Sequence, residues 1–226
     1  MGNPVRPERR ASDETETERA NRGEWDRYAD EYQQTHGRFL GDAGFVWSPE
    51  GTDEGDLHLL GDVADQAVLE IGCGAAQCSR WVLAQGGHPV GLDLSHRQLQ
   101  HSRRIDDELG TRVPVVEGTG TALPFADATF DAVLNAVSIQ YLTKPVEVFA
   151  SVARVLRPGG LLVIATSHRM FPTKAVAAWH SLEPGEHLRL IGAYCALAGG
   201  FAAARVLDRS PRGADPLWVV VATRAS

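Results

Sequence analysis

Residues 68–77, V-L-E-I-G-C-G-A-A-Q, decide the fold of this chain. An apolar run ends in an acid and continues into two glycines separated by one residue. This pattern predicts a buried strand over residues 67–71 and then a tight turn. A predicted helix over residues 76–85 follows, and its first amide groups favour a negatively charged ligand. Glycine also lets a ligand approach the main chain closely. The stretch therefore predicts a ligand-binding turn between a strand and a helix.

The chain beyond this turn repeats the alternation of short apolar runs with longer amphipathic runs. The predicted strands cover residues 67–71, 89–93, 113–117, 132–136, 161–166, 201–208 and 217–222, and the predicted helices cover 76–85, 95–109, 146–156, 173–180 and 184–198. The connector between the last two strands has no room for a helix, so these strands are expected to pair antiparallel. We therefore expect an α/β fold with a Rossmann-like, doubly wound sheet of seven strands, mostly parallel with a C-terminal antiparallel hairpin.

The N-terminal part of the chain differs from the rest in composition. Residues 1–20 are polar and mixed in charge, which predicts a disordered tail. Residues 21–60 are interpreted as a helical lid and flap, because aromatic residues recur at helical spacing and then scatter through a glycine-rich stretch. Residues 21–226 are expected to form a single domain, which suits the length of the chain.

Composition narrows the classes of function. The formal net charge is −7, whereas a nucleic-acid-binding protein usually has a basic surface. The apolar runs are too short to span a bilayer, and the N-terminus lacks an apolar leader segment. The three cysteines, Cys73, Cys78 and Cys195, have neither zinc-like spacing nor an even count, and the first two are interpreted as small packing residues. We expect a reduced cytoplasmic protein, monomer or homodimer, with no metal, membrane or nucleic-acid partner.

Two kinds of cofactor use a glycine turn of this type, a nicotinamide dinucleotide and a sulfonium compound. A dinucleotide fingerprint would have glycine at position 77, where this chain has Gln77. Glu70 would repel a pyrophosphate and would suit a cationic ligand such as an amino or sulfonium group. Asp93, at the end of the second predicted strand, can bond ribose hydroxyls and would serve either cofactor. These residues favour the sulfonium and make a nicotinamide-dependent reductase the weaker alternative.

Four motifs in this order and at these spacings resemble the class I S-adenosylmethionine-dependent methyltransferase family. They are V-L-E-I-G-C-G at 68–74, G-L-D-L-S at 91–95, A-L-P-F-A-D-A-T-F-D-A-V at 122–133 and A-R-V-L-R-P-G-G-L-L at 153–162. The resemblance covers roughly residues 67–167. It implies S-adenosylmethionine as the cofactor, methyl transfer as the reaction and a sheet that ends in an antiparallel hairpin.

The resemblance also implies a role for each matching residue. Glu70 would lie near the methionine amino group, Asp93 would bind the ribose, and Leu94 would lie against the adenine. Thr119 stands where family members often carry an aspartate that bonds the adenine, so that contact is expected to differ here. The implied cofactor-binding residues are Tyr28, Glu70, Gly72, Cys73, Gly74, Asp93, Leu94, Thr119, Gly120, Asn135 and Ala136.

The methyl acceptor is expected beyond the carboxyl ends of the strands, where ligands bind in open α/β sheets. His168 follows the fifth predicted strand and is the candidate general base, with a role in ordering its loop as the alternative. The candidate acceptor-binding residues are Tyr32, His36, Trp47, Tyr141 and Arg169. Their aromatic character favours a mostly apolar small molecule. An RNA or protein acceptor, or a non-catalytic regulatory module that only binds the cofactor, are the alternatives.

Overall fold

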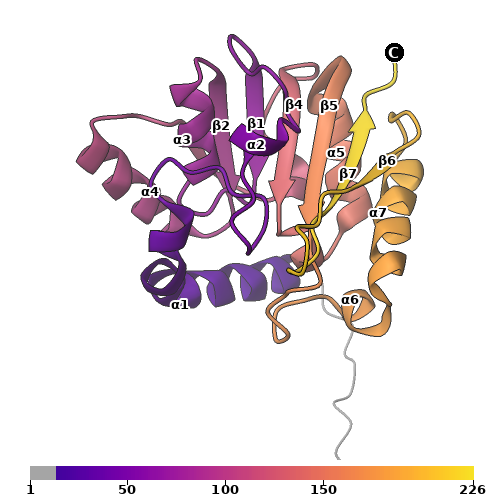
Figure 1. Cartoon of the computed structure of the whole chain (residues 1–226), viewed down its shortest axis with the longest axis horizontal. Helices are drawn as coiled ribbons and strands as arrows, with labels where there is room; N and C mark the ends of the chain where they lie inside the picture. The colour runs from indigo at the N-terminus through magenta and orange to yellow at the C-terminus, as the bar shows by residue number, and fades with distance from the viewer. Residues whose placement is uncertain (1–13) are drawn as a thin grey trace, which may run out of the picture.

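A seven-stranded sheet forms the centre of the computed structural model, which describes residues 14–226 (Figure 1). The strand order is β3-β2-β1-β4-β5-β7-β6. The strands are β1 (Ala67–Ile71), β2 (His88–Asp93), β3 (Val115–Glu117), β4 (Phe130–Ala136), β5 (Leu156–Thr166), β6 (Arg205–Asp208) and β7 (Trp218–Thr223). β7 pairs antiparallel with β5 and β6, and the other neighbouring strands pair parallel. The predicted mixed sheet with its C-terminal antiparallel pair is confirmed.

The two faces of the sheet are buried under different elements. Val68 packs with Phe45 and Val82 on one face, which is covered by the flap and by α3 (Gln77–Ala84). Its neighbour Leu69 packs with Phe149 and Ile191 on the other face, under α5 (Pro145–Val155) and α7 (Pro184–Ala198). Successive side chains of a strand point to opposite faces, so burial on both sides explains the near-continuous apolar strands.

β1 lies at the point where the winding of the sheet changes direction. It pairs with β2 on one side and with β4 on the other. The chain leaves β1 through α3, returns as β2, continues through α4 (His96–Leu109) to β3, and then crosses to β4. Such a crossing opens a crevice outside the carboxyl ends of the strands on either side of it. The ligand site is therefore expected beyond the ends of β1, β2 and β4.

The N-terminal helix, α1 (Glu14–Leu40), crosses these carboxyl ends (Figure 1). It begins inside the segment that was predicted to be a disordered tail, and residues 1–13 of that segment lie outside the described part of the chain. Contacts of α1 with β3 and η1 explain why this part of the predicted tail is helical. Thr121 Oγ1 donates to Glu18 Oε1 at 3.4 Å, and Arg22 lies 3.3 Å from Glu117. The tail prediction considered only the polar composition and missed these partners.

The flap between α1 and β1 is a packed unit. Its centre is Trp47, which is fully buried and donates from Nε1 to Glu54 at 2.7 Å. Glu54 begins the short helix α2 (Glu54–Leu57) and also accepts the amides of Leu59 and Leu60. The buried carboxylate thus accepts three hydrogen bonds from the flap in the place of water. This bonding holds the flap against one face of the sheet.

The remaining boundaries follow local chemistry. β3 is shorter than predicted because Pro114 cannot donate a ladder hydrogen bond. The predicted helix over 173–180 shrinks to α6 (Ala177–Ser181), and two 3₁₀ turns, η1 (Gly120–Ala122) and η2 (Ile139–Tyr141), follow β3 and β4. Within residues 14–226, no helix combines the length and the apolar character that crossing a bilayer would require.

Candidate functional site

The glycine turn after β1 forms the floor of the site. The amides of Gly72 and Cys73 donate to the carbonyl oxygen of Leu92 at 2.8 and 3.1 Å. Gly72 and Gly74 have φ values of +73° and +54°, a region that L side chains rarely adopt. A Cβ at Gly72 would also lie 2.8 Å from Ser138 Oγ. The turn therefore needs glycine for its conformation and for the close approach of the chain after β4.

Arg80 of α3 braces this turn from the protein interior. Its guanidinium donates to the carbonyl oxygen of Ala75 and lies 2.9 Å from the Asp106 carboxylate of α4, with both side chains almost fully buried. Arg80 Nε also donates to the carbonyl oxygen of Asp42 in the flap at 2.5 Å. One side chain thus joins the turn, α4 and the flap. Sequence reasoning did not single out Arg80, since nothing local marks it as buried.

The two strand-end acids have different environments. Asp93 accepts from the amides of Gly74 and Ser95, both at 2.8 Å, and its side chain lines the site. Glu70 is buried and accepts from the amide and hydroxyl of Ser79 at 2.9 and 2.5 Å. Burial raises the pKa of Glu70 to about 7, although the Ser79 bonds oppose this rise. Asp93 is therefore held rigidly toward a ligand, whereas Glu70 is engaged with the first turn of α3.

The end of β4 and the residues that follow it complete the floor opposite the glycine turn. Asn135 donates from Nδ2 to the carbonyl oxygen of Ile71 at 3.1 Å and to Ser138 Oγ at 2.6 Å. Val137 has φ of +49°, an uncommon conformation for a β-branched residue, and its amide donates to Ala165. Such backbone strain clusters at binding and catalytic sites.

Two side chains beside the glycine turn each carry a buried polar atom without a hydrogen-bond partner. Within the described part of the chain, neither Oδ1 of Asn135 nor Nε2 of Gln77 has a hydrogen-bond partner. Buried polar atoms are nearly always paired, so an unpaired acceptor and an unpaired donor beside the glycine turn indicate a ligand with groups of both kinds. Gln77, which replaced the third glycine of the dinucleotide pattern, is one of the two.

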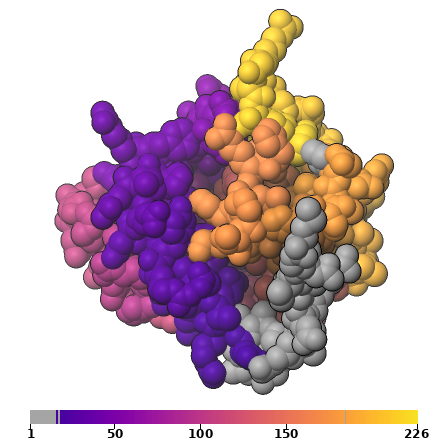
Figure 2. Space-filling view, turned by 90° about the horizontal axis from the view of Figure 1, so that it is seen from below, coloured from indigo at the N-terminus to yellow at the C-terminus, as the bar shows by residue number. Residues whose placement is uncertain are grey.

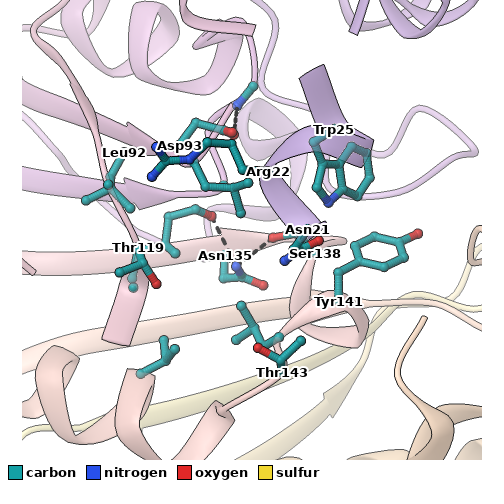
Figure 3. Close-up of a pocket in the computed structure, with 18 of the residues that line it drawn as sticks. Asn21, Arg22, Trp25, Leu92, Asp93, Thr119, Asn135, Ser138, Tyr141 and Thr143 are labelled. Carbon is teal, nitrogen blue, oxygen red and sulfur yellow. Dashed lines mark hydrogen bonds between the residues drawn. The ribbon is translucent and has the colours of Figure 1, made fainter. Parts of the chain in front are cut away.

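A first cavity of about 190 Å³ extends from the turn along β2 and β3 (Figure 3). Eight of the predicted cofactor-binding residues line it: Gly72, Gly74, Asp93, Leu94, Thr119, Gly120, Asn135 and Ala136. Thr119 Oγ1 caps η1 by accepting the amide of Thr121 at 3.4 Å. A Cβ at Gly120 would lie 3.1 Å from Val148, so this wall is also close-packed. The motif-based prediction thus selected residues that converge on one cavity.

A second cavity of about 470 Å³ adjoins the first on the flap side. Glu70 and Cys73, also predicted as cofactor-binding residues, line this cavity, as do Tyr32, His36, Tyr141 and Arg169 from the predicted acceptor set. The residues common to both cavities are Tyr32, Gly72, Gly74, Ala136, Val137, Tyr141 and Phe171. These seven residues mark the junction of the two cavities.

Aromatic side chains from two distant segments form the roof over this junction. Tyr28 and Tyr32 of α1 pack edge-on against Phe171, with ring centroids 5.3 and 6.3 Å apart. Tyr141 accepts the amide of Phe171 at 3.0 Å, and its ring lies 5.2 Å from that of Trp25. Figure 2 shows α1 and the orange segment after β5 side by side across this end of the molecule. The roof therefore depends on contacts between α1 and residues 167–176.

Three predicted site residues lie elsewhere. Trp47 is fully buried in the flap and lines neither cavity. Tyr28 packs on the outer side of the roof, where Lys174 Nζ lies 4.7 Å from its ring. His168 is half exposed and lies 3.3 Å from Asp215, outside both cavities. Neighbours of these residues in the chain line the cavities, and the sequence could not indicate which way each side chain turns.

Arg169 lines the second cavity with both sides of its guanidinium engaged. It forms an ion pair with Asp215 and lies 3.4 Å from Glu50. Its charge is thus already compensated by two acidic side chains of the same chain. No group of three or more histidine, cysteine or acidic side chains suited to a metal ion occurs within residues 14–226.

Sequence reasoning missed polar residues on the inner face of α1. Asn21 and Arg22 line the first cavity one turn before Trp25, and Glu18 lies one turn earlier still (Figure 3). Extending the three-and-four spacing of Trp25, Ala29 and Tyr32 toward the N-terminus would have found these positions. Phe171 was missed because a loop has no periodicity from which a direction can be read.

Comparisons with known proteins agree with this geometry. Residues 69–164 match the protein family described as "Methyltransferase domain". A demethylmenaquinone methyltransferase of Renibacterium salmoninarum is 34% identical over 51% of this chain and 47% of that protein. A 24-methylenesterol C-methyltransferase 2 of Oryza sativa subsp. japonica is 30% identical over 74% of this chain and 49% of that protein. The chain thus spans about half the length of these curated relatives.

A solved structure shares the fold at lower sequence similarity. Phosphoethanolamine N-methyltransferase 2 of Haemonchus contortus, solved with phosphomonomethylethanolamine and S-adenosylhomocysteine, superposes with a TM-score of 0.69 and 18% identity. The superposition covers 91% of this chain and 60% of that one. Residues 69–164 therefore form a methyltransferase domain, and the strand order and the glycine turn of the chain agree with this match to S-adenosylmethionine-dependent methyltransferases.

Proposed function

We propose that the protein transfers the methyl group of S-adenosylmethionine to a small molecule held in the second cavity. The observation that carries the proposal is that the two cavities meet at Gly72 and Gly74. Tyr32 and Tyr141 also line both cavities. A bisubstrate transfer needs two ligands that meet at one point away from water.

The residues of the floor fit this cofactor. S-adenosylmethionine supplies a methyl group already activated on a positively charged sulfur, together with an amino acid end that carries an ammonium and a carboxylate. Asn135 Oδ1 is an unpaired acceptor suited to the ammonium, and Gln77 Nε2 is an unpaired donor suited to the carboxylate. Asp93 would bind the ribose hydroxyls, while Leu94 and Gly120 would contact the adenine.

The roof supports an apolar acceptor of modest size. Aromatic and aliphatic side chains line the second cavity, among them Phe39, Leu40 and Met170. Small-molecule sites are typically apolar cavities with a few placed polar groups. The relatives are named for a demethylmenaquinone and a methylenesterol, which supports a small molecule over RNA or protein.

Calorimetry on the purified protein tests the cofactor part of the proposal. We expect saturable binding of S-adenosylmethionine and S-adenosylhomocysteine and no binding of NADP. Binding of NADP alone would reject the proposal. Homocysteine release should then be followed across small phenolic, quinone-like and sterol acceptors, with an RNA and a peptide included. Turnover of only the RNA or the peptide would reject a small-molecule acceptor, and cofactor binding without any turnover would favour the regulatory module.

A further inference from the structure

His36 occupies a distinctive position in the second cavity. It lies one helical turn after Tyr32, a residue of the junction, and the two rings stack with centroids 4.6 Å apart. The imidazole ring is also perpendicular to the ring of Phe171, with the two centroids 6.2 Å apart. The imidazole is therefore held beside the point where the two cavities meet.

The hydrogen bonds of His36 define its tautomer. Nδ1 lies 3.2 Å from the carbonyl oxygen of Tyr32, which can only accept, and 2.7 Å from Thr35 Oγ1. The Thr35 hydroxyl proton is engaged, since it points to the carbonyl oxygen of Glu31 at 2.8 Å. Nδ1 thus carries the proton of the neutral ring, and Nε2 keeps its lone pair. Within residues 14–226, no group bonds Nε2.

Most of the other titratable side chains that line this cavity are buried or paired with another group. They are Tyr32, Glu70, Cys73, Cys78, Tyr141 and Arg169. Burial raises the pKa of Tyr32 to about 12, and it raises the pKa of both thiols and of Tyr141 as well. Glu70 accepts two bonds from Ser79, and Arg169 is a cation paired with Asp215. His36, in contrast, is only partly buried, and its Nε2 bonds no group within residues 14–226.

We propose that His36 is the general base of this site and that the acceptor is an aromatic molecule methylated on a hydroxyl oxygen. The inference rests on the proposed function. A base is useful only when the nucleophile must lose a proton, and a phenolic hydroxyl is acidic enough to give one to an imidazole. The aromatic walls formed by Tyr32, Phe39 and Phe171 favour a ring over an alkyl chain.

The step balances in atoms and charge. The acceptor oxygen forms its bond to the methyl carbon as the carbon–sulfur bond breaks, and the hydroxyl proton moves to Nε2 of His36. The electron pair of the broken bond stays on sulfur, which becomes the neutral thioether of S-adenosylhomocysteine. The imidazolium then returns its proton to water when the products leave.

The ionisation of a bound phenol tests the proposal without turnover. 4-Nitrophenol is titrated into the protein saturated with S-adenosylhomocysteine, and the phenolate absorbance is followed against pH. We expect the ionisation constant of the bound phenol to be about tenfold larger, or more, in the wild type than in His36→Gln. Failure of 4-nitrophenol to bind, or equal ionisation in the two proteins, would overturn the proposal. Failure of S-adenosylhomocysteine to bind would instead reject the proposed function.

Matched histidine variants and a direct measurement of the tautomer complete the test. His88→Gln, at the exposed start of β2, and His168→Gln, in the loop after β5 but outside both cavities, are the controls. In both variants the bound phenol should ionise as it does in the wild type. A change in His168→Gln alone would identify His168 as the base. In ¹⁵N-histidine spectra, His36 should carry its proton on Nδ1, and a proton on Nε2 would contradict the assignment. Unchanged affinity of His36→Gln for S-adenosylhomocysteine verifies that the variant folds.

Discussion

The floor and the roof of the site are built in opposite ways. Main-chain hydrogen bonds and glycines form the floor, where Gly72, Gly74 and Asp93 are held within a close-packed sheet edge. Side-chain packing forms the roof, where rings of α1 meet Phe171 and exposed ion pairs surround them. A floor made of main-chain groups suits a ligand that is the same throughout a family, because main-chain groups do not change when side chains are substituted. A roof of side chains can change with the acceptor while the floor stays intact.

The largest effect is expected from the closest approach in the floor. Gly72→Ala adds a Cβ 2.8 Å from Ser138 Oγ at a φ of +73°. Strain and displacement together should lower the free energy of unfolding by roughly 2–5 kcal/mol and greatly weaken cofactor binding. Urea unfolding and calorimetry with S-adenosylhomocysteine measure both quantities.

Gly86→Ala is the matched control for this change. Its φ is +83°, yet nothing lies within 4 Å of the added Cβ. The free energy of unfolding of Gly86→Ala should therefore fall only by the cost of the left-handed conformation, about 1–2 kcal/mol. Its affinity for S-adenosylhomocysteine should not change. Equal losses in the two variants would show that the close approach to Ser138 contributes nothing.

The second effect concerns Glu70, the buried acid beneath the turn. Its pKa of about 7 in the folded protein exceeds the ordinary value of 4.5, so the folded state binds more protons between these pH values. Its contribution to stability is present below pH 4.5 and is lost as the pH rises through 7, up to about 3 kcal/mol in total. Glu70→Gln should remove this loss.

Urea unfolding of wild type and Glu70→Gln at pH 5, 6, 7 and 8 measures the difference. The variant should gain stability relative to the wild type as the pH rises. Glu108→Gln, an exposed acid on α4, should show no comparable trend. A constant difference across the pH range would mean that Glu70 is already ionised at pH 5.

The third effect tests the acid that faces the ligand. Asp93→Asn places an amide NH₂ against a backbone amide donor, either that of Gly74 or that of Ser95. Calorimetry should give a loss of about 1–3 kcal/mol in cofactor binding. Asp62→Asn, in the exposed loop before β1, serves as the control. Unchanged affinity of Asp93→Asn would mean that this carboxylate does not hold the ribose.

The smallest effect is expected in the roof. Lys174 lies 5.1 and 4.7 Å from the ring centroids of Trp25 and Tyr28, and 3.7 Å from Glu24. Lys174→Met should weaken the contact between α1 and the segment after β5 by about 0.5–1 kcal/mol. Hydrogen exchange should become faster in α1. Arg189→Met, at an exposed position on α7, should leave the exchange of α1 unchanged. Faster exchange in β1 as well would contradict the separation of roof from floor.

The quality of the sequence predictions follows the same division. β1 was predicted with its observed bounds, and Gly72, Gly74, Asp93 and Asn135 were all predicted for the cavity that they line. These residues are marked by local features: a turn, a strand end or a motif at fixed spacing. Trp47 and His168 belong to segments that reach the site, but the direction of each side chain depends on its partner, which is Glu54 for Trp47 and Asp215 for His168.

Local sequence patterns were enough to predict the α/β alternation, the antiparallel end of the sheet and the glycine turn. Hydrophobic period and turn chemistry act over a few residues, so they can be read locally. Contacts in the folded chain include residues 14–20 in α1, bring Arg80 against the turn and bring Phe171 against Tyr32 above the junction. These contacts join residues far apart in the chain, and they depend on which faces remain to be covered once the sheet has formed.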